Sequence, residues 1–152
     1  MKTDSTFTRR SVLGAGVAGM AAASGLAQAQ AAGPIRIGST LALTGPLSAT
    51  AQVHKIVGEI YVEQANKRGG WLGRQLEWVL KDDQSKPDLA RTLYEQLVTA
   101  DKVDLLMGPY ATGAILSAMG VAQRYDKVLV HHTFGVPSLA KYERAFPAWS
   151  LG

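Results

Sequence analysis

Cysteine is absent from the 152-residue sequence, which excludes disulfide bonds, cysteine-ligated zinc and thiol catalysis. Charged residues are also scarce, at 18%, whereas apolar residues make up 47%, so the composition is that of a folded globular chain. The net charge of +4 is modest, and without Lys2, Asp4, Arg9 and Arg10 the excess of basic residues falls to two. A nucleic-acid-binding surface is therefore not expected.

A run of apolar and small residues near the N-terminus, Val12–Ala23, is shorter than the roughly 20 residues that a membrane span needs. It follows a polar start and the pair Arg9-Arg10, which is the three-part pattern of a secretory signal and resembles the twin-arginine export motif. Small residues favour cleavage near Ala29 or Ala31. We therefore expect residues 1–31 to be a signal peptide and the remainder to be exported to the periplasm; a membrane anchor is the alternative.

The same segment contains a match to the dinucleotide-binding pattern G-x-G-x-x-G at residues 14–19. That motif binds a pyrophosphate only where a strand enters it and a helix leaves it. Here two arginines precede it and the expected cleavage follows. The sequence therefore predicts neither a nucleotide nor any other cofactor.

After Pro34 the sequence alternates between strand and helix patterns. Apolar segments bounded by turn residues predict strands at 35–43, 75–81, 104–107 and 128–130. Apolar residues spaced three and four apart predict three intervening helices. Their apolar stripes are Val53, Ile56, Val57, Ile60 and Tyr61 in the first, Leu89, Leu93, Leu97 and Val98 in the second, and Ile115, Ala118, Met119 and Ala122 in the third. Beyond Pro137 the pattern indicates only a short helical piece and an irregular end.

Strands that alternate with helices predict an α/β fold, a doubly wound parallel sheet with helices on both faces. In a strand order of 2-1-3-4 the winding reverses between the first and third strands. Ligands bind at the carboxyl ends of strands at such a switch point. The loops that we expect there are residues 44–52, 108–113 and 132–137.

The loop Gly108–Gly113 leads directly into a predicted helix, so the amides of Thr112 and Gly113 should face solvent at the positive end of the helix dipole. Such an end suits a carboxylate. The alternative is that Thr112 only caps the helix. Tyr110 is expected either to stack on a ligand or to shield the end of the sheet.

Two other polar pairs lie at predicted strand ends. His131 and His132 are adjacent, so their side chains point to opposite faces and do not easily share a metal ion, and we expect no metal site there. Asp82 and Asp83 are expected to bind loop amides or cap the next helix. No nucleophile elbow, phosphate loop or metalloprotease motif is present, so the sequence predicts a protein that is not an enzyme.

Several short motifs occur in order along residues 34–140: Ile35-Arg36-Ile37-Gly38, Leu43–Ser48, Asn66–Gly70, Asp82-Asp83 and Gly108-Pro109. Together with the predicted signal peptide they resemble the type I periplasmic binding proteins of the branched-chain amino acid class. These are the substrate receptors of ABC importers, and they bind a solute between two α/β lobes. The resemblance implies that this chain binds an amino acid or a similar small carboxylated solute and delivers it to ABC permease subunits.

The resemblance also implies where the first lobe touches its ligand. The segments after the third and fourth strands hold the carboxylate and ammonium groups of an amino acid in this family. They correspond here to Tyr110, Ala111, Thr112 and Gly113, and to Thr133, Phe134 and Gly135. Gly135 departs from the hydroxyl residue that many amino-acid receptors have at its position.

Family members are about twice this length or more, so residues 32–152 are expected to form an incomplete N-terminal lobe. A lobe that ends after its fourth strand would leave that sheet edge unpaired and apolar helix stripes exposed. The sequence thus resembles a fragment or a truncated product. A ligand-sensing domain of the same fold and a non-functional remnant are the alternative interpretations.

Overall fold

A computed structural model of the chain describes residues 33–132 and 141–148. In this part of the chain, five parallel strands form one sheet in the order β2-β1-β3-β4-β5. The elements are β1 (Ile35–Leu41), α2 (Ser48–Lys67), β2 (Leu76–Asp82), α3 (Pro87–Thr99), β3 (Leu105–Met107), α4 (Thr112–Arg124), β4 (Leu129–His131) and β5 (Ala145–Pro147). The doubly wound α/β fold and the order of the first four strands are therefore confirmed.

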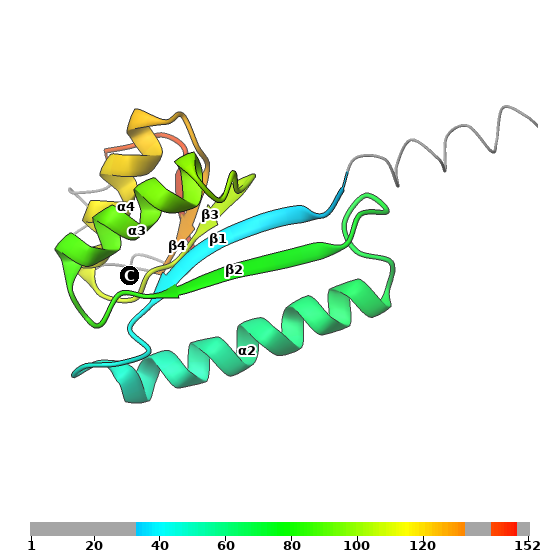
Figure 1. The fold of residues 1–152 in the computed structure, drawn as a ribbon, viewed down its shortest axis with the longest axis horizontal. Coiled ribbons are helices and arrows are strands. Elements are labelled where there is room, and N and C mark those ends of the chain that lie inside the picture. Colours follow the sequence, from blue (N-terminus) through cyan, green and yellow to red (C-terminus); the bar gives the residue numbers. More distant parts are fainter. Residues whose placement is uncertain (1–32, 133–140, 149–152) are drawn as a thin grey trace, which may run out of the picture.

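The helices lie on two sides of the sheet. α3 and α4 cover one face, whereas α2 runs beneath β1 and β2 on the other (Figure 1). This division follows from right-handed crossovers: the chain moves from β1 to β2 in one direction and from β2 to β3 and β4 in the other. The winding thus reverses at β1 and β3, as the sequence predicted.

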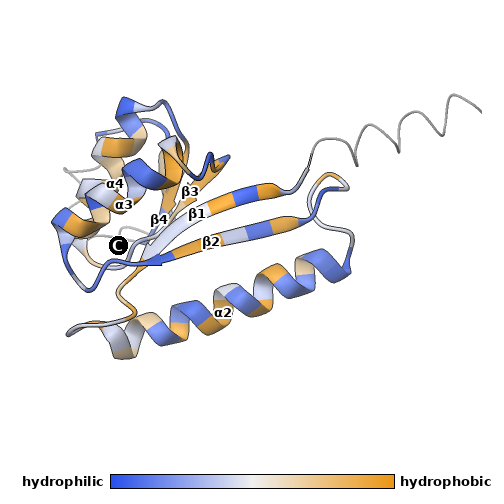
Figure 2. Ribbon diagram, viewed as in Figure 1, coloured by the Kyte–Doolittle hydropathy of each residue, from blue (hydrophilic) through white to orange (hydrophobic). Residues whose placement is uncertain are grey.

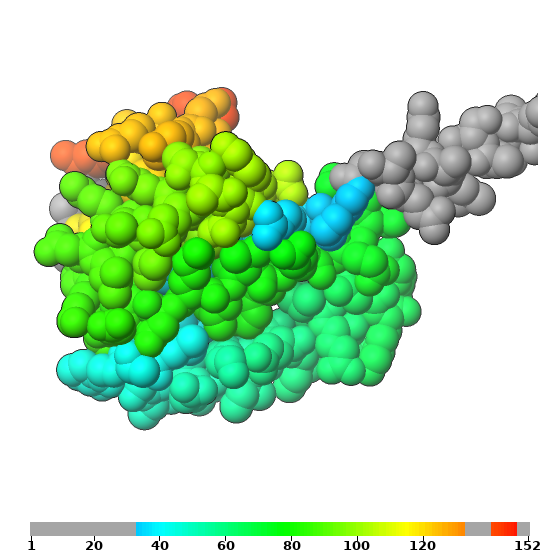
Figure 3. Space-filling model, in the orientation of Figure 1, coloured from blue at the N-terminus to red at the C-terminus, as the bar shows by residue number. Residues whose placement is uncertain are grey.

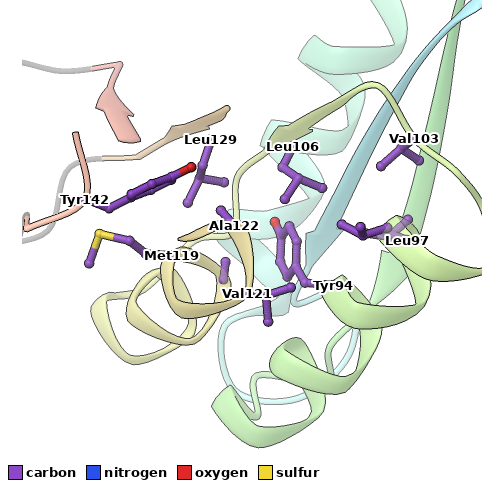
Figure 4. Close-up of a cluster of buried hydrophobic side chains, with 11 residues drawn as sticks. Tyr94, Leu97, Val103, Leu106, Met119, Val121, Ala122, Leu129 and Tyr142 are labelled. Atoms are coloured by element: carbon purple, nitrogen blue, oxygen red, sulfur yellow. The ribbon is translucent and has the colours of Figure 1, made fainter. Parts of the chain in front are cut away.

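The main core lies between the sheet and the α3–α4 face. Tyr94 and Leu97 from α3 meet Leu106 and Leu129 from the strands, and all four are at most 1% exposed (Figure 4). All four residues of the predicted α4 stripe are buried. The buried face of α3 is centred on Ala90 and Tyr94, so the predicted Leu89 and Leu93 lie at its border.

The predicted apolar stripe of α2 exists but is only about half buried. Its residues Val53, Ile56, Val57, Ile60 and Tyr61 are 49–61% exposed, and only Ala51 and Ala65 of this helix are buried. Val53, Val57 and Tyr61 line an open space between α2 and the sheet, whereas Ile56 and Ile60 lie outside that lining. Apolar and polar residues are mixed along the visible length of α2 (Figure 2), which forms the lower border of the space-filling view (Figure 3). The expectation of an exposed apolar stripe is confirmed here.

The helix approaches the sheet closely on its inner side. A Cβ atom at Gly58 would lie 2.5 Å from the ring of Trp78 on β2, so glycine is required at this contact. Together, Gly58 and Trp78 set the distance between α2 and the sheet.

The sequence prediction was wrong about the end of the chain and the free sheet edge. Residues 145–147 form a fifth strand that pairs with β4, with Leu129 opposite Ala145 and His131 opposite Pro147. Two of its three residues are exposed, so it lacks the buried apolar run that identifies β3 and β4, and Pro147 argues against a strand except at an edge. The edge of β4 is therefore paired, and β5 is the outer strand.

Candidate ligand-binding site

The segments that follow β1 and β3 meet at the switch point of the sheet, together with His132 after β4, whereas the rest of the third expected loop, residues 133–137, lies outside the described residues. Buried Tyr94 of α3 fixes the ends of two of these strands. The hydroxyl oxygen of Tyr94 lies 2.7 Å from the carbonyl oxygen of Met107 and 2.8 Å from that of Gly108. The same oxygen accepts a hydrogen bond from the amide of Thr40 at 3.3 Å. Burial raises the pKa of this phenol, so it stays protonated and donates to these carbonyls.

The pair Asp82-Asp83 binds the loops, as predicted. Asp82 accepts hydrogen bonds from the hydroxyl of Thr44 at 2.7 Å and from the amide of Gln84 at 2.9 Å. Asp83 is buried and accepts the hydroxyl of Thr40 at 2.7 Å and the amide of Ser85 at 3.0 Å. Burial raises the pKa of Asp83, an effect that hydrogen bonds from Thr40 and Ser85 oppose. Both carboxylates therefore position the loops around the site.

The start of α4 presents free backbone amides. Ala111 is the N-cap residue, with φ 82°, and no side chain caps the helix. The predicted alternative, a cap by Thr112, is therefore wrong, because Thr112 is already the first residue of the helix. The first intrahelical bond runs from the amide of Ile115 to the carbonyl of Ala111 at 3.0 Å. The amides of residues 112–114 precede that bond and have no partner within the helix. No acidic residue occupies the first turn, so these amides are available to bind an anion.

Gly113 allows α4 to begin close to α3. A Cβ atom at this position would lie 3.1 Å from Cγ of Pro87, the first residue of α3. The two helix N-termini therefore lie together at the carboxyl edge of the sheet. The remaining predicted contacts, Thr133, Phe134 and Gly135, fall outside the described residues.

Tyr110 joins a cluster of rings that the sequence analysis did not foresee. Its ring centroid lies 5.3 Å from that of His54 on α2 and 5.6 Å from that of His132 after β4. The Nε2 atoms of His54 and His132 are 2.8 Å apart, although 78 residues separate them in the sequence. The third histidine of the chain, His131, is buried beside them, with Nδ1 hydrogen-bonded to the carbonyl of His132.

These rings border an apolar cavity of about 560 Å³ between α2 and the sheet. The cavity is lined by side chains from β1, α2, β2, β3 and β4, among them Ile37, Leu41, Val57, Tyr61, Trp78 and Met107. The ring cluster thus lies where this apolar space meets the carboxyl edge of the sheet.

Within the described ranges, the structure contains no group of three or more histidine, aspartate or glutamate side chains arranged to hold a metal ion. In the same ranges no helix has the length and apolar character of a membrane span. The geometry is that of an open binding surface at a switch point.

Comparison with known proteins supports this assignment. Residues 34–149 match the family model described as periplasmic binding protein, so the chain belongs to the periplasmic binding protein family. The chain is 33% identical over 114 residues to the chemotactic signal transduction system substrate-binding protein BasB of Halobacterium salinarum, covering 74% of this chain and 28% of BasB. It is 29% identical over 107 residues to the Leu/Ile/Val-binding protein BraC3 of Rhizobium johnstonii, covering 70% and 29% of the two chains.

A solved structure shows the same fold. The branched-chain amino acid transporter substrate-binding protein LivJ of Streptococcus pneumoniae, in complex with isoleucine, superposes with a TM-score of 0.71 at 29% identity. The match covers 75% of this chain and 33% of LivJ. The chain therefore spans about a third of the length of the relatives it matches.

Proposed function

We propose that residues 32–152 belong to the first lobe of an exported solute receptor. The receptor would capture an amino acid or a similar small carboxylated solute and deliver it to ABC permease subunits. Residues 1–31 would act as the twin-arginine signal peptide that brings it to the periplasm. The names of BraC3 and LivJ, which refer to branched-chain amino acids, support this solute class.

One observation carries the proposal: the uncapped N-terminus of α4 lies at the switch point of the sheet. There the Thr112 hydroxyl and the amides of Thr112 and Gly113 would bind the solute's carboxylate, with Tyr110 and Ala111 forming the wall. Thr133, Phe134 and Gly135 would complete the first-lobe contacts. Hydrogen bonds to a charged group each contribute about 1.5–3 kcal/mol, but binding also costs about 4–15 kcal/mol of lost translational and rotational freedom. The few bonds of one lobe therefore fall short of the roughly 8 kcal/mol of a micromolar receptor.

Calorimetry on a two-lobe protein tests this proposal. Residues 32–152 would be joined to the second lobe of LivJ and titrated with leucine, isoleucine and valine. We expect micromolar binding, which Thr112→Ala weakens about tenfold because it removes one hydroxyl contact. Thr92→Ala is the matched control, because Thr92 lies exposed on α3, where its hydroxyl bonds only the carbonyl of Asp88. Equal affinity of the two variants would refute the placement of the site.

A sensory role is the second candidate, because the name of BasB refers to chemotactic signal transduction. The two roles share the binding step and differ in the membrane partner. Uptake of the labelled solute by cells that carry the receptor would favour transport. A chemotactic response without uptake would favour sensing.

A further inference from the structure

The strongest feature outside the carboxylate site is the pair formed by His54 and His132. His54 is the seventh residue of α2 and His132 follows β4, and both border the same cavity. Their rings meet edge to face, with centroids 4.7 Å apart and an interplanar angle of 81°. The two Nε2 atoms point at one another at 2.8 Å.

The hydrogen bonds fix the proton on each ring. Nδ1 of His54 lies 2.9 Å from the carbonyl of Thr50, and because a carbonyl only accepts, this Nδ1 carries the proton. In the neutral ring the lone pair is then on Nε2, so Nε2 of His132 donates to it. A histidine that donates one ring nitrogen to a backbone carbonyl and presents the other is the arrangement found at metal ions.

We propose that His54 and His132 form a two-histidine site for a divalent transition-metal ion, Cu²⁺ in preference to Ni²⁺ or Zn²⁺. Two metal–nitrogen bonds of about 2.0–2.1 Å that meet at a right angle at the ion place the two nitrogens about 2.9 Å apart. The observed separation of 2.8 Å therefore fits two neighbouring positions of a tetragonal ion with little movement of either ring. Water would occupy the remaining positions on the solvent side, because no further histidine, aspartate or glutamate side chain among the described residues joins the pair.

Binding requires one local rearrangement. The ring proton of His132 moves from Nε2 to Nδ1, so both Nε2 lone pairs face the ion, and no net proton is released from the neutral pair. This site does not depend on which solute the receptor carries.

Copper titration of the 152-residue protein without an affinity tag tests the proposal. We expect one Cu²⁺ to bind with a micromolar dissociation constant. Its electron paramagnetic resonance spectrum should show splitting from two imidazole nitrogens. His54→Ala and His132→Ala should each remove one nitrogen from the spectrum and weaken binding at least tenfold. Both side chains are partly exposed, so circular dichroism should show an unchanged fold.

Gln52→Ala is the control, because Gln52 is an exposed residue of the same helix that is not part of the pair. It should bind copper as the unchanged protein does, with the same two-nitrogen spectrum. Copper binding that persists unweakened in both alanine variants would overturn the proposal. So would a spectrum of the unchanged protein without splitting from two nitrogens. Should His132→Ala fail to fold, His54→Ala alone decides.

Discussion

Asp82 shows how single residues hold the binding loops in place. Burial alone would raise the pKa of its carboxyl group, but hydrogen bonds from Thr44, Gln84 and Leu43 outweigh that effect and lower the pKa below its ordinary value. A carboxyl group of this kind stabilises the fold above its unfolded pKa of about 3.9. The contribution is lost as the pH falls through the lower, folded pKa.

Asp82→Asn is therefore expected to destabilise the protein at pH 7 by about 1 kcal/mol, because a neutral amide replaces the charged acceptor of the hydrogen bonds from Thr44 and Gln84. The difference from the unchanged protein should begin to shrink below about pH 4, where the unfolded chain binds the proton, and should disappear as the pH falls through the lower pKa of folded Asp82. Thermal unfolding followed by circular dichroism at pH 7 and pH 3 measures both effects. Glu143→Gln, at an exposed position, is the control. A difference that stays constant over this pH range would contradict the assigned role.

Export is expected to depend on both arginines of the N-terminal pair. The receptor that reads a twin-arginine signal recognises guanidinium groups, whose planar fork lysine does not reproduce. Replacing Arg9 and Arg10 together by lysine should leave the unprocessed precursor in the cytoplasm. Cell fractionation of a reporter fused after Gly33 measures this. A reporter that reaches the periplasm despite both changes would show that export uses another route.

At the scale of elements, α2 is the helix whose packing is least complete. Its apolar stripe is about half exposed, and i,i+4 ion pairs such as Lys55–Glu59 accompany it along the helix. Exposed apolar surface of this kind drives association. The 152-residue protein is therefore expected to self-associate at micromolar concentration.

Replacing Ile56 and Ile60 by lysine should reduce that association while leaving the unfolding midpoint nearly unchanged, because both side chains are more than half exposed and lie outside the lining of the cavity. Sedimentation velocity measures the association state, and thermal unfolding measures stability. Leu72→Lys is a useful comparison, because Leu72 is 91% exposed but lies outside α2. A monomeric unchanged protein would refute the prediction.

The elements also show what the sequence could predict. The first four strands and the buried face of α4 follow from apolar runs and apolar spacing, and the loop role of Asp82 and Asp83 follows from their place at a strand end. β3 and β4 have only three residues each but are apolar and partly buried, whereas β5 is mostly exposed and ends in Pro147, so it lacks such a signal. The pair His54–His132 could not be predicted, because only the assembled sheet brings a helix and a strand end 78 residues apart into contact.

At the scale of the whole molecule, the described part of the chain presents the open amides of α4 at the switch point of its sheet, and the family match covers residues 34–149. The relatives are about three times as long as this chain. In the proposed function this surface forms one side of the site and a second lobe completes it. We therefore expect the surface to select a carboxylate on its own.

A nuclear magnetic resonance titration of ¹⁵N-labelled residues 32–152 with leucine tests that claim most directly. We expect millimolar binding, with the largest shifts at the amides of Thr112, Gly113 and Ala114. Leucinamide, which has the same side chain but no carboxylate, should leave these amides unchanged. Equal shifts with both compounds, or leucine-induced shifts confined to other parts of the chain, would contradict the account.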